Sequence, residues 1–433
     1  MNNPDLPLDG ADGTAMLAAI ASGKTCAEAV VRACLARIEA REPLLKAWAW
    51  IDGPAALTQA RDLDKQRARR PLHGLPIGVK DVVNTRDMPT QHNSPHYTGS
   101  RPGLDAACIE VLREAGALII GKTETVEFAA GGRKALTRNP ADLTRTPGGT
   151  SSGSAAAVAD FHVPLALATQ TSGSTIRPAS YCGVYALKPS WGVVSREGVK
   201  MFANSLDTLT WMARSVRDLR LLAEVFDLPD DTSVRPDAAP LRIGICRTPF
   251  WARAEDSTRF AMDEAIVALR QSGAVVTDID LPAAFAGLLR AHSVVMEGEA
   301  RGAFLNEYRR HGAALHPHLR KRVENSLGLT HNDLRAAYDL AASCRQAFDE
   351  IAAPFDAILT PSSTGVAPLG IDSTGDSTFS RSWSLLHVPC INIPVRSLVR
   401  GLPIGLTLTT SRFGDLRLLR VADQVAAVIG GRD

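Results

Sequence analysis

The sequence predicts an α/β layer fold. Short apolar segments typical of buried strands alternate along the 433 residues with segments that repeat apolar positions at helical spacing. Apolar residues make up 45% of the chain and charged residues 22%, a globular composition that excludes a disordered, collagen-like or coiled-coil protein. A length of about 150 residues per domain would allow two or three domains. Because no repeat or low-complexity linker divides the chain, we predict a single domain over residues 1–433.

The N-terminal part is predicted to be mainly helical. Thr25 is a candidate N-cap for a helix that continues to residue 42. A strand is expected at residues 47–51 and a polar helix at residues 54–70. The basic run at the end of this helix has no interleaved aromatic residues, which indicates a solvated helix end and not a nucleic-acid site.

Strands and helices alternate more closely from residue 75 onward. Buried strands are predicted at residues 77–79 and 118–120, with a helix at residues 107–114 between them. The long helical zone at about residues 288–351 is typical of a helical cap inserted between strands. Further strands are predicted at residues 241–246, 275–279 and 357–359.

Charge and cysteine usage restrict the class of protein. The 48 basic and 46 acidic residues leave a net charge of +2, so no overall field favours nucleic acid or an anionic membrane. No apolar run approaches the roughly 18 residues of a membrane span, and the first residues lack the features of a signal peptide. The seven scattered cysteines form no Cys-x-x-Cys pair, which indicates reduced thiols. We therefore expect a soluble cytoplasmic protein that is large enough to be an enzyme.

Three motifs are set aside. The P-loop pattern at residues 116–123 contains the predicted strand 118–120 where a phosphate-binding loop would be needed. The G-x-S-x-G pattern at residues 149–153 follows a polar, proline-containing segment and not the strand that a nucleophile elbow requires. His316 and His318 are the closest histidine pair, but no H-E-x-x-H motif accompanies them, so no metal is predicted.

Three other segments carry groups suited to nucleophilic catalysis. Residues 74–81 form an apolar strand that ends in Lys80, whose amine would lose its proton readily if it were buried; a solvated surface lysine is the alternative. Residues 147–154 place hydroxyls on a glycine-rich turn before an alanine-rich helix. Residues 169–179 place hydroxyls among successive backbone N–H groups, which can stabilise a developing oxyanion. The apolar flank at residues 163–168 argues against a flexible linker.

Together these segments resemble the amidase signature family, serine hydrolases that use a Ser–cis-Ser–Lys triad. The resemblance extends over roughly residues 12–428 and implies a central mixed β-sheet with helices on both faces. It also implies a signature core at about residues 70–216 and a variable helical insertion at about residues 249–353. The motifs that carry it are Gly-Leu-Pro-Ile-Gly-Val-Lys-Asp at 74–81, Gly-Lys-Thr with Glu127-Phe128-Ala129, the block 147–189, Ser205-Leu206-Asp207-Thr208, Arg214-Ser215-Val216 and Leu402-Pro403-Ile404-Gly405-Leu406.

The resemblance assigns roles to individual residues. It places the general base at Lys80 and the nucleophile at Ser174. The bridging hydroxyl precedes the nucleophile by 174 − 150 = 24 positions, which gives the role to Thr150 and leaves Ser151 as the reserve. The implied oxyanion-hole N–H groups belong to Thr171, Ser172, Gly173 and Ser174. No metal or organic cofactor is implied.

The chain departs from the family pattern near the nucleophile. Thr150 stands where the family usually has serine, and its methyl group adds bulk and restricts χ1. Gln170 stands where aspartate is frequent, and Ser172 where glycine is frequent. The arginine after the nucleophile is moved by one position, to Arg177.

The expected function is hydrolysis of a small-molecule amide-type C–N bond, with carbamates and aryl esters as further substrates. One alternative is the A subunit of a tRNA-dependent amidotransferase, which would need partner subunits and an ammonia channel. The missing aspartate at Gln170 counts against that alternative. A second alternative is a non-catalytic binding protein with the amidase fold.

The substrate pocket is expected between the variable parts of the chain. Its predicted walls are residues 249–326 and the segment 373–383. The amphipathic N-terminal helices are compatible with a homodimer. Side chains that are candidates either for the pocket lining or for the core are Met296, Phe304, Trp383 and His387.

Overall fold

The computed structural model describes residues 10–66, 69–229, 239–395 and 401–430. Its centre is one sheet, which has 11 strands in this described part of the chain, in the order β1-β3-β2-β4-β6-β5-β10-β11-β9-β7-β8. The strands are β1 (Trp48–Ile51), β2 (Pro76–Lys80), β3 (Leu118–Thr123), β4 (Leu165–Gln170), β5 (Tyr185–Lys188), β6 (Thr208–Ala213), β7 (Arg242–Ile245), β8 (Val275–Asp278), β9 (Ala357–Pro361), β10 (Cys390–Pro394) and β11 (Gly405–Thr409).

The sheet is mixed, as the family resemblance implies. β2 pairs in parallel with β3 and β4, and β7 pairs in parallel with β8 and β9. The other pairings are antiparallel. Because β2, β3 and β4 are parallel neighbours, the segments that follow them start at the same edge of the sheet. This edge brings Lys80 close to the turn after β4.

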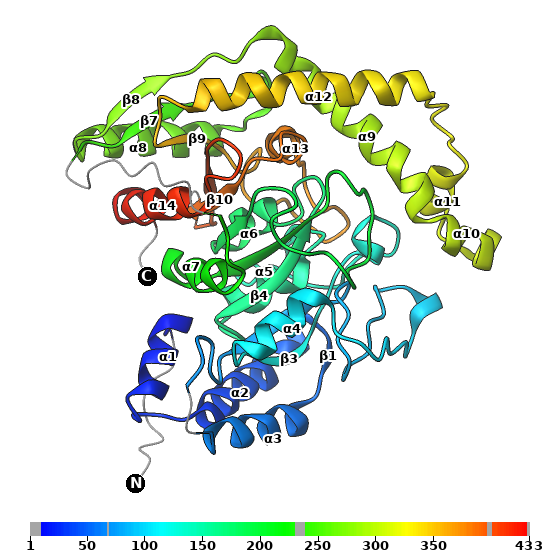
Figure 1. Ribbon diagram of the computed structural model, residues 1–433, viewed down its shortest axis with the longest axis vertical. Coiled ribbons are helices and arrows are strands. Elements are labelled where there is room, and N and C mark those ends of the chain that lie inside the picture. Colours follow the sequence, from blue (N-terminus) through cyan, green and yellow to red (C-terminus); the bar gives the residue numbers. More distant parts are fainter. Residues whose placement is uncertain (1–9, 67–68, 230–238, 396–400, 431–433) are drawn as a thin grey trace.

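Helices cover both faces of this sheet (Figure 1). Successive strand residues point to opposite faces, so in β4 Leu165 and Leu167 pack into one core while Ala166 and Ala168 pack into the other. One core is covered mainly by α1 (Gly13–Ala21), α4 (Ala107–Glu114), α7 (Val216–Val225), α8 (Asp256–Gln271) and α14 (Asp415–Ile429). The other is covered mainly by α2 (Ala27–Leu45), α3 (Gly53–Asp64), α5 (Ser152–Ala159), α6 (Ile176–Cys182), α9 (Leu288–Ala303), α12 (His331–Ala352) and α13 (Thr378–Leu385).

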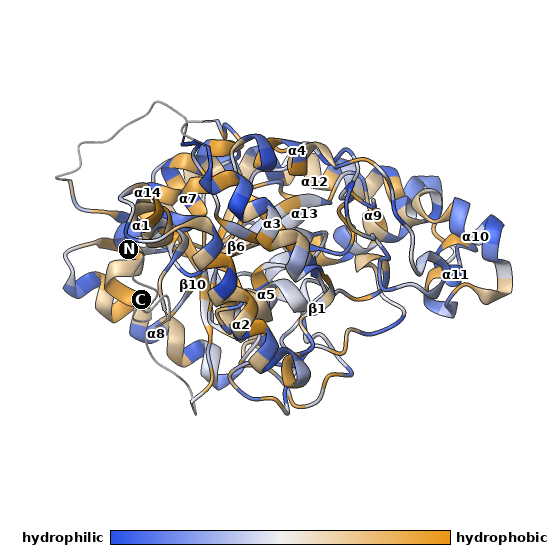
Figure 2. Cartoon of the chain, turned by 90° about the horizontal axis from the view of Figure 1, so that it is seen from below, coloured by the Kyte–Doolittle hydropathy of each residue, from blue (hydrophilic) through white to orange (hydrophobic). Residues whose placement is uncertain are grey.

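A helical arm extends from the sheet. It consists of α9, α10 (Leu305–His311), α11 (Pro317–Val323) and α12, and Figure 1 shows it reaching beyond the sheet at one end of the molecule. The outermost helix, α10, is largely hydrophilic (Figure 2). A small core joins the arm to the body, where Phe304 of the arm packs edge-on against Phe128. The predicted insertion at residues 249–353 is only partly helical, because it includes β8, which pairs with β7 at the sheet edge.

Most local predictions agree with the structure. The helix at residues 107–114 is observed with these limits, and the residues of the P-loop pattern form β3, so they cannot wrap a phosphate group. The prediction of Thr25 as an N-cap is wrong. α2 begins at Ala27, and its first N–H groups donate to the carboxylate of Asp64 at 2.8 and 3.0 Å, so a distant side chain performs the capping. α3 ends at Asp64, and residues 67–68 of the predicted helix lie outside the described residues.

No helix among the described residues combines the length and the apolar character needed to cross a bilayer. All seven cysteines lie in the described part of the chain, and each is a free thiol there.

Candidate active site

Lys80 ends β2 with its side chain completely buried, which excludes the alternative of a surface lysine. Among the described residues, no carboxylate forms an ion pair with it. Burial therefore lowers the pKa of Lys80 well below its usual value, and the negative charge of Asp207 opposes part of this shift. The closest partners of Nζ are the hydroxyls of Thr150 at 2.8 Å, Ser151 at 2.9 Å and Thr169 at 2.9 Å, and Nζ also donates to the carbonyl of Thr169 at 3.4 Å.

Thr150 lies on the glycine-rich turn before α5. The Gly149–Thr150 peptide bond is cis, and the carbonyl of Thr150 accepts hydrogen bonds from Val126 N and Thr125 Oγ1. Thr150 also lines the cavity described below, so its hydroxyl lies between the Lys80 amine and that cavity. A side chain at position 149 would force Thr374 to move, because an added Cβ would lie 2.6 Å from Thr374 Cγ2.

Ser151 occupies a different environment. It is completely buried, accepts a hydrogen bond from Lys80 and donates to the carbonyl of Thr169 at 3.2 Å. It does not line the cavity. Its backbone N–H donates to the carbonyl of Ser174 at 3.2 Å, which joins the turn before α5 to the turn before α6. The geometry therefore favours Thr150 over Ser151 for contact with a substrate.

Ser174 lies in the turn between β4 and α6 and is 7% exposed. Gln170 holds this turn, because its Oε1 accepts hydrogen bonds from the N–H groups of Thr175 at 2.9 Å and Ile176 at 3.0 Å. Its Nε2 donates to Ser384 Oγ, which in turn donates to the carbonyl of Ser172. An aspartate could accept the first pair of bonds but has no N–H to donate, so the glutamine gives this chain an additional link to α13.

The backbone before Ser174 is available for an oxyanion. Within the described chain, the N–H groups of residues 172–174 have no hydrogen-bond acceptor. Gly173 leaves no room for a side chain, since an added Cβ would lie 2.9 Å from Ser377 Cβ. Ser172 Oγ contacts Met296 Sδ at 3.5 Å, which brings α9 next to this segment.

Asp207 supports the same segment, although its sequence context predicts no role for it. Its Oδ1 accepts the Thr171 hydroxyl at 2.6 Å, and its Oδ2 accepts the N–H groups of Phe202 and Ala203. Burial raises the pKa of this carboxyl group, and the three hydrogen bonds oppose the rise. The only sequence signal was its position inside the Ser205–Thr208 motif.

A cavity of about 430 Å³ opens beside Thr150. Both predicted wall segments contribute to it, through His316 and His318 and through Ser373 and Thr374. None of the residues that line it is phenylalanine, tyrosine or tryptophan. The four candidate lining residues lie elsewhere. Phe304 and Trp383 are in the core, His387 stacks on Trp191, and Met296 contacts Ser172.

The histidine pair has a structural role in the described structure. His316 is the N-cap of α11, and its Nδ1 accepts the backbone N–H of His318 at 3.2 Å. His318 lies against Gly131 on the opposite wall, where an added Cβ would be 2.8 Å from the imidazole ring. The pair therefore shapes the cavity wall.

A family model described as Amidase matches residues 29–419, which include all the site residues discussed above. The chain belongs to the amidase family. The A subunit of glutamyl-tRNA(Gln) amidotransferase from Chloroflexus aurantiacus is similar to this amidase-family chain, with 35% identity over 462 residues and 95% of each chain covered.

Two solved structures of similar fold extend the comparison. The native peptide amidase from Stenotrophomonas maltophilia aligns with a TM-score of 0.83 and 27% identity, covering 99% of this chain and 98% of that one. A structure described as a vestigial protein complex that reveals the origins of an s-triazine catabolic enzyme aligns with a TM-score of 0.86 and 27% identity, covering 98% and 100% of the two chains. The amidase signature fold is thus shared with proteins that carry different functional names.

Proposed function

We propose that this chain cleaves an amide C–N bond through an acyl-enzyme on Ser174. The observation that carries the proposal is the hydrogen bond of 2.8 Å between the Lys80 amine and the Thr150 hydroxyl. A buried lysine with a lowered pKa is a base near neutral pH, and a hydroxyl can relay a proton because it both donates and accepts.

In the proposed mechanism, neutral Lys80 takes the proton of Thr150 while Thr150 takes the proton of Ser174. The Ser174 oxygen attacks the carbonyl carbon, and the oxyanion accepts hydrogen bonds from the N–H groups of residues 171–174. Each such donor contributes about 3–4 kcal/mol to acyl-transfer catalysis. The proton then returns through Thr150 to the leaving nitrogen as the C–N bond breaks. Water cleaves the acyl-enzyme by the same proton route.

Thr150 lines the cavity and Ser174 does not, so the cavity serves in this proposal as the space through which a small substrate reaches the site. Its volume of about 430 Å³ and its lack of phenylalanine, tyrosine and tryptophan suit a compact aliphatic or polar carboxamide, or the corresponding carbamate. Aryl esters belong to the proposal only as activated substrates, because none of these three large aromatic side chains is present in the lining to stack on an aryl group.

A second candidate is the A subunit of a tRNA-dependent amidotransferase. Relatives at 35% identity are named as this component of the glutamyl-tRNA(Gln) amidotransferase, and this favours the second candidate over a free-standing amidase. The same acyl-enzyme chemistry would then release ammonia for use in a complex with partner subunits. Gln170, at a position where the family often has aspartate, is a point against this candidate.

Labelling with a fluorophosphonate probe tests the shared chemistry. We expect one adduct, mapped by mass spectrometry to Ser174, that is lost in Ser174→Ala and Lys80→Met. No adduct on folded wild-type protein, or an adduct on Ser151, would contradict the proposal. Ammonia release from primary amides, including glutamine, is then measured with the chain alone and with the other subunits of a bacterial amidotransferase. A rate that depends on those subunits supports the second candidate, and full activity of the chain alone supports the first.

A further inference from the structure

Arg177 is a buried cation that the proposed mechanism does not use. It lies in the first turn of α6, three residues after Ser174, and is 5% exposed. Within the described chain no carboxylate forms an ion pair with it, and burial lowers the pKa of its guanidinium group. Desolvating a cation is costly, so the bonds that this side chain makes must compensate for its burial.

Those bonds join three parts of the site. Nη2 donates to the carbonyl of Gly149 at 2.5 Å, and this carbonyl belongs to the peptide that precedes Thr150. Nη2 also donates to Thr374 Oγ1 at 3.0 Å, and Nη1 donates to the carbonyl of Gly375 at 2.8 Å. One planar group thus connects the nucleophile helix, the turn that carries the bridging hydroxyl and the cavity wall at residues 373–375.

This wall is in close contact with both turns at two glycines. Thr374 lies against Gly149, and Ser377 lies against Gly173, in each case too close for an added Cβ. On its other side, Gly375 lies against Tyr181 of α6, where an added Cβ would be 2.4 Å from the phenol oxygen. A shift of the wall would therefore move the peptide before Thr150 as well.

We propose that Arg177 is a positioning residue that fixes the Thr150 hydroxyl and the cavity wall 373–377 in one arrangement, so that the fit of the substrate to this wall and the rate of acylation depend on the same guanidinium. The inference rests on the proposed function. From position 177 the side chain reaches Gly149 and the wall together.

The test compares Arg177→Lys and Arg177→Ala with Arg145→Ala. Arg145 is the matched control because it donates to the carbonyl of Ala367, in the chain leading to the same wall, and does not touch Gly149. The readouts are the rate of fluorophosphonate labelling at Ser174 and the burst and steady-state rates with p-nitrophenyl acetate, all per folded molecule. Displacement of a reacting group by about 1 Å costs about 100-fold, so we expect a loss of this order in acylation for both Arg177 variants. Arg145→Ala should stay within about threefold of wild type.

A second readout separates positioning from folding. Guanidinium chloride added below denaturing concentration should increase the acylation rate of Arg177→Ala at least about tenfold. It should not increase the acylation rate of Lys80→Met. The pH at half-maximal labelling should not change in Arg177→Lys, because Lys80 keeps its hydroxyl partners. Labelling of both Arg177 variants within about twofold of wild type, or a loss no larger than that of Arg145→Ala, would overturn the inference. If wild-type Ser174 takes no label while the chain is folded, the proposed function itself fails and this inference fails with it.

Discussion

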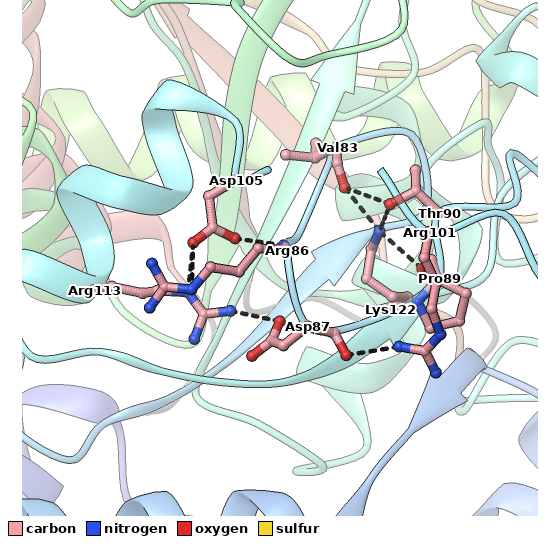
Figure 3. A network of polar contacts seen from close by, with 9 residues as sticks. All are labelled: Val83, Arg86, Asp87, Pro89, Thr90, Arg101, Asp105, Arg113 and Lys122. Carbon is pink, nitrogen blue, oxygen red and sulfur yellow. Dashed lines mark hydrogen bonds and ion pairs between the residues drawn. The ribbon is translucent and has the colours of Figure 1, made fainter. Parts of the chain in front are cut away.

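Two buried lysines on neighbouring parallel strands, of which one is the proposed base, differ in the groups that surround them. Lys80 and Lys122 lie in β2 and β3, both completely buried, and burial lowers the pKa of each. Lys122 has an ion-pair partner, Asp81, at 3.4 Å. It also donates to the carbonyls of Val83 and Pro89 and to the Thr90 hydroxyl, as Figure 3 shows. Its pKa falls only to about 8. Lys80 has no ion pair in the described structure, and its closest partners are hydroxyls.

The difference lies in what the partners can do. A carboxylate and a carbonyl only accept hydrogen bonds, so they stabilise the three N–H donors of an ammonium group. A hydroxyl can reverse its role and donate to a neutral amine, so three hydroxyls satisfy Lys80 in either protonation state. Burial alone therefore does not make a catalytic lysine, and the chemistry of the surrounding groups decides.

The largest expected effect is that of Lys80→Met. Removing the base from a serine hydrolase site costs about 10⁴-fold or more in acylation. The melting temperature should be unchanged or higher, because an apolar side chain replaces a buried amine without an ion pair. Fluorophosphonate labelling and thermal unfolding measure the two effects. Lys188→Met is the control, since this third buried lysine has a pKa lowered by burial but donates to the carbonyl of Pro189. Equal losses of acylation rate in Lys80→Met and Lys188→Met would show that the hydroxyl partners of Lys80 do not distinguish it from other buried lysines.

The next effect concerns the bridging hydroxyl. Thr150→Val keeps the shape of the side chain and removes the proton relay, so we expect a loss of about 10²–10⁴-fold in acylation. Thr150→Ser should stay within about tenfold of wild type, because it retains the hydroxyl. Stopped-flow measurement of the acylation burst gives these rates. A larger loss in Ser151→Ala than in Thr150→Val would assign the relay to the reserve residue.

Lys122→Met should affect stability and leave the chemistry nearly intact. It leaves Asp81 buried without its cation, and breaking a buried pair costs about 3–5 kcal/mol of unfolding free energy. The acylation rate per folded molecule should change by less than about threefold. Urea unfolding and active-site titration separate the two quantities. The double variant Lys122→Met/Asp81→Asn should recover part of the stability, and failure to recover any would show that the ion pair is not the cause.

The smallest expected effect is on the pH profile of Lys122→Arg. Activity requires neutral Lys80, so the rate should increase with pH through the folded-state pKa of Lys80 and level off above it. Arginine stays charged over this range, so replacing Lys122 should leave the position of the rise unchanged. The measurement is labelling rate against pH for both proteins. Loss of the rise, or its displacement, would mean that Lys122 with its pKa of about 8 controls the profile.

The candidate site could be located from the sequence because the family resemblance assigns its residues one by one. The local pattern alone gives an apolar strand that ends in Lys80 and two turns rich in glycine and hydroxyl groups, and the structure brings the Lys80 amine to the Thr150 hydroxyl. What could not be predicted depends on distant contacts. Arg177 donates a hydrogen bond to Gly375, which is 198 positions away in the sequence, and Thr171 donates one to Asp207, which is 36 positions away.

The cap of α2 was mispredicted for a similar reason. Asp64, 37 positions away, accepts the N–H of Ala27, while Thr25 was the only suitable residue nearby in sequence. Periodicity reports which face of an element is buried but not which distant residue it will meet. Distant contacts also determine the cavity lining. For this reason the four predicted lining residues do not include the two histidines that line the wall.

The order of the site along the chain has a consequence for how such a protein can change over generations. The residues proposed for the proton relay and the oxyanion segment all lie between positions 80 and 174, whereas one part of the cavity wall, with His316, His318, Ser373 and Thr374, comes from later segments. A gene rearrangement that exchanges the coding region for the helical arm would therefore change the His316 and His318 part of this wall while the codons for the proposed chemistry stay in place. Related proteins can in this way share one reaction and differ in the substrates that they accept.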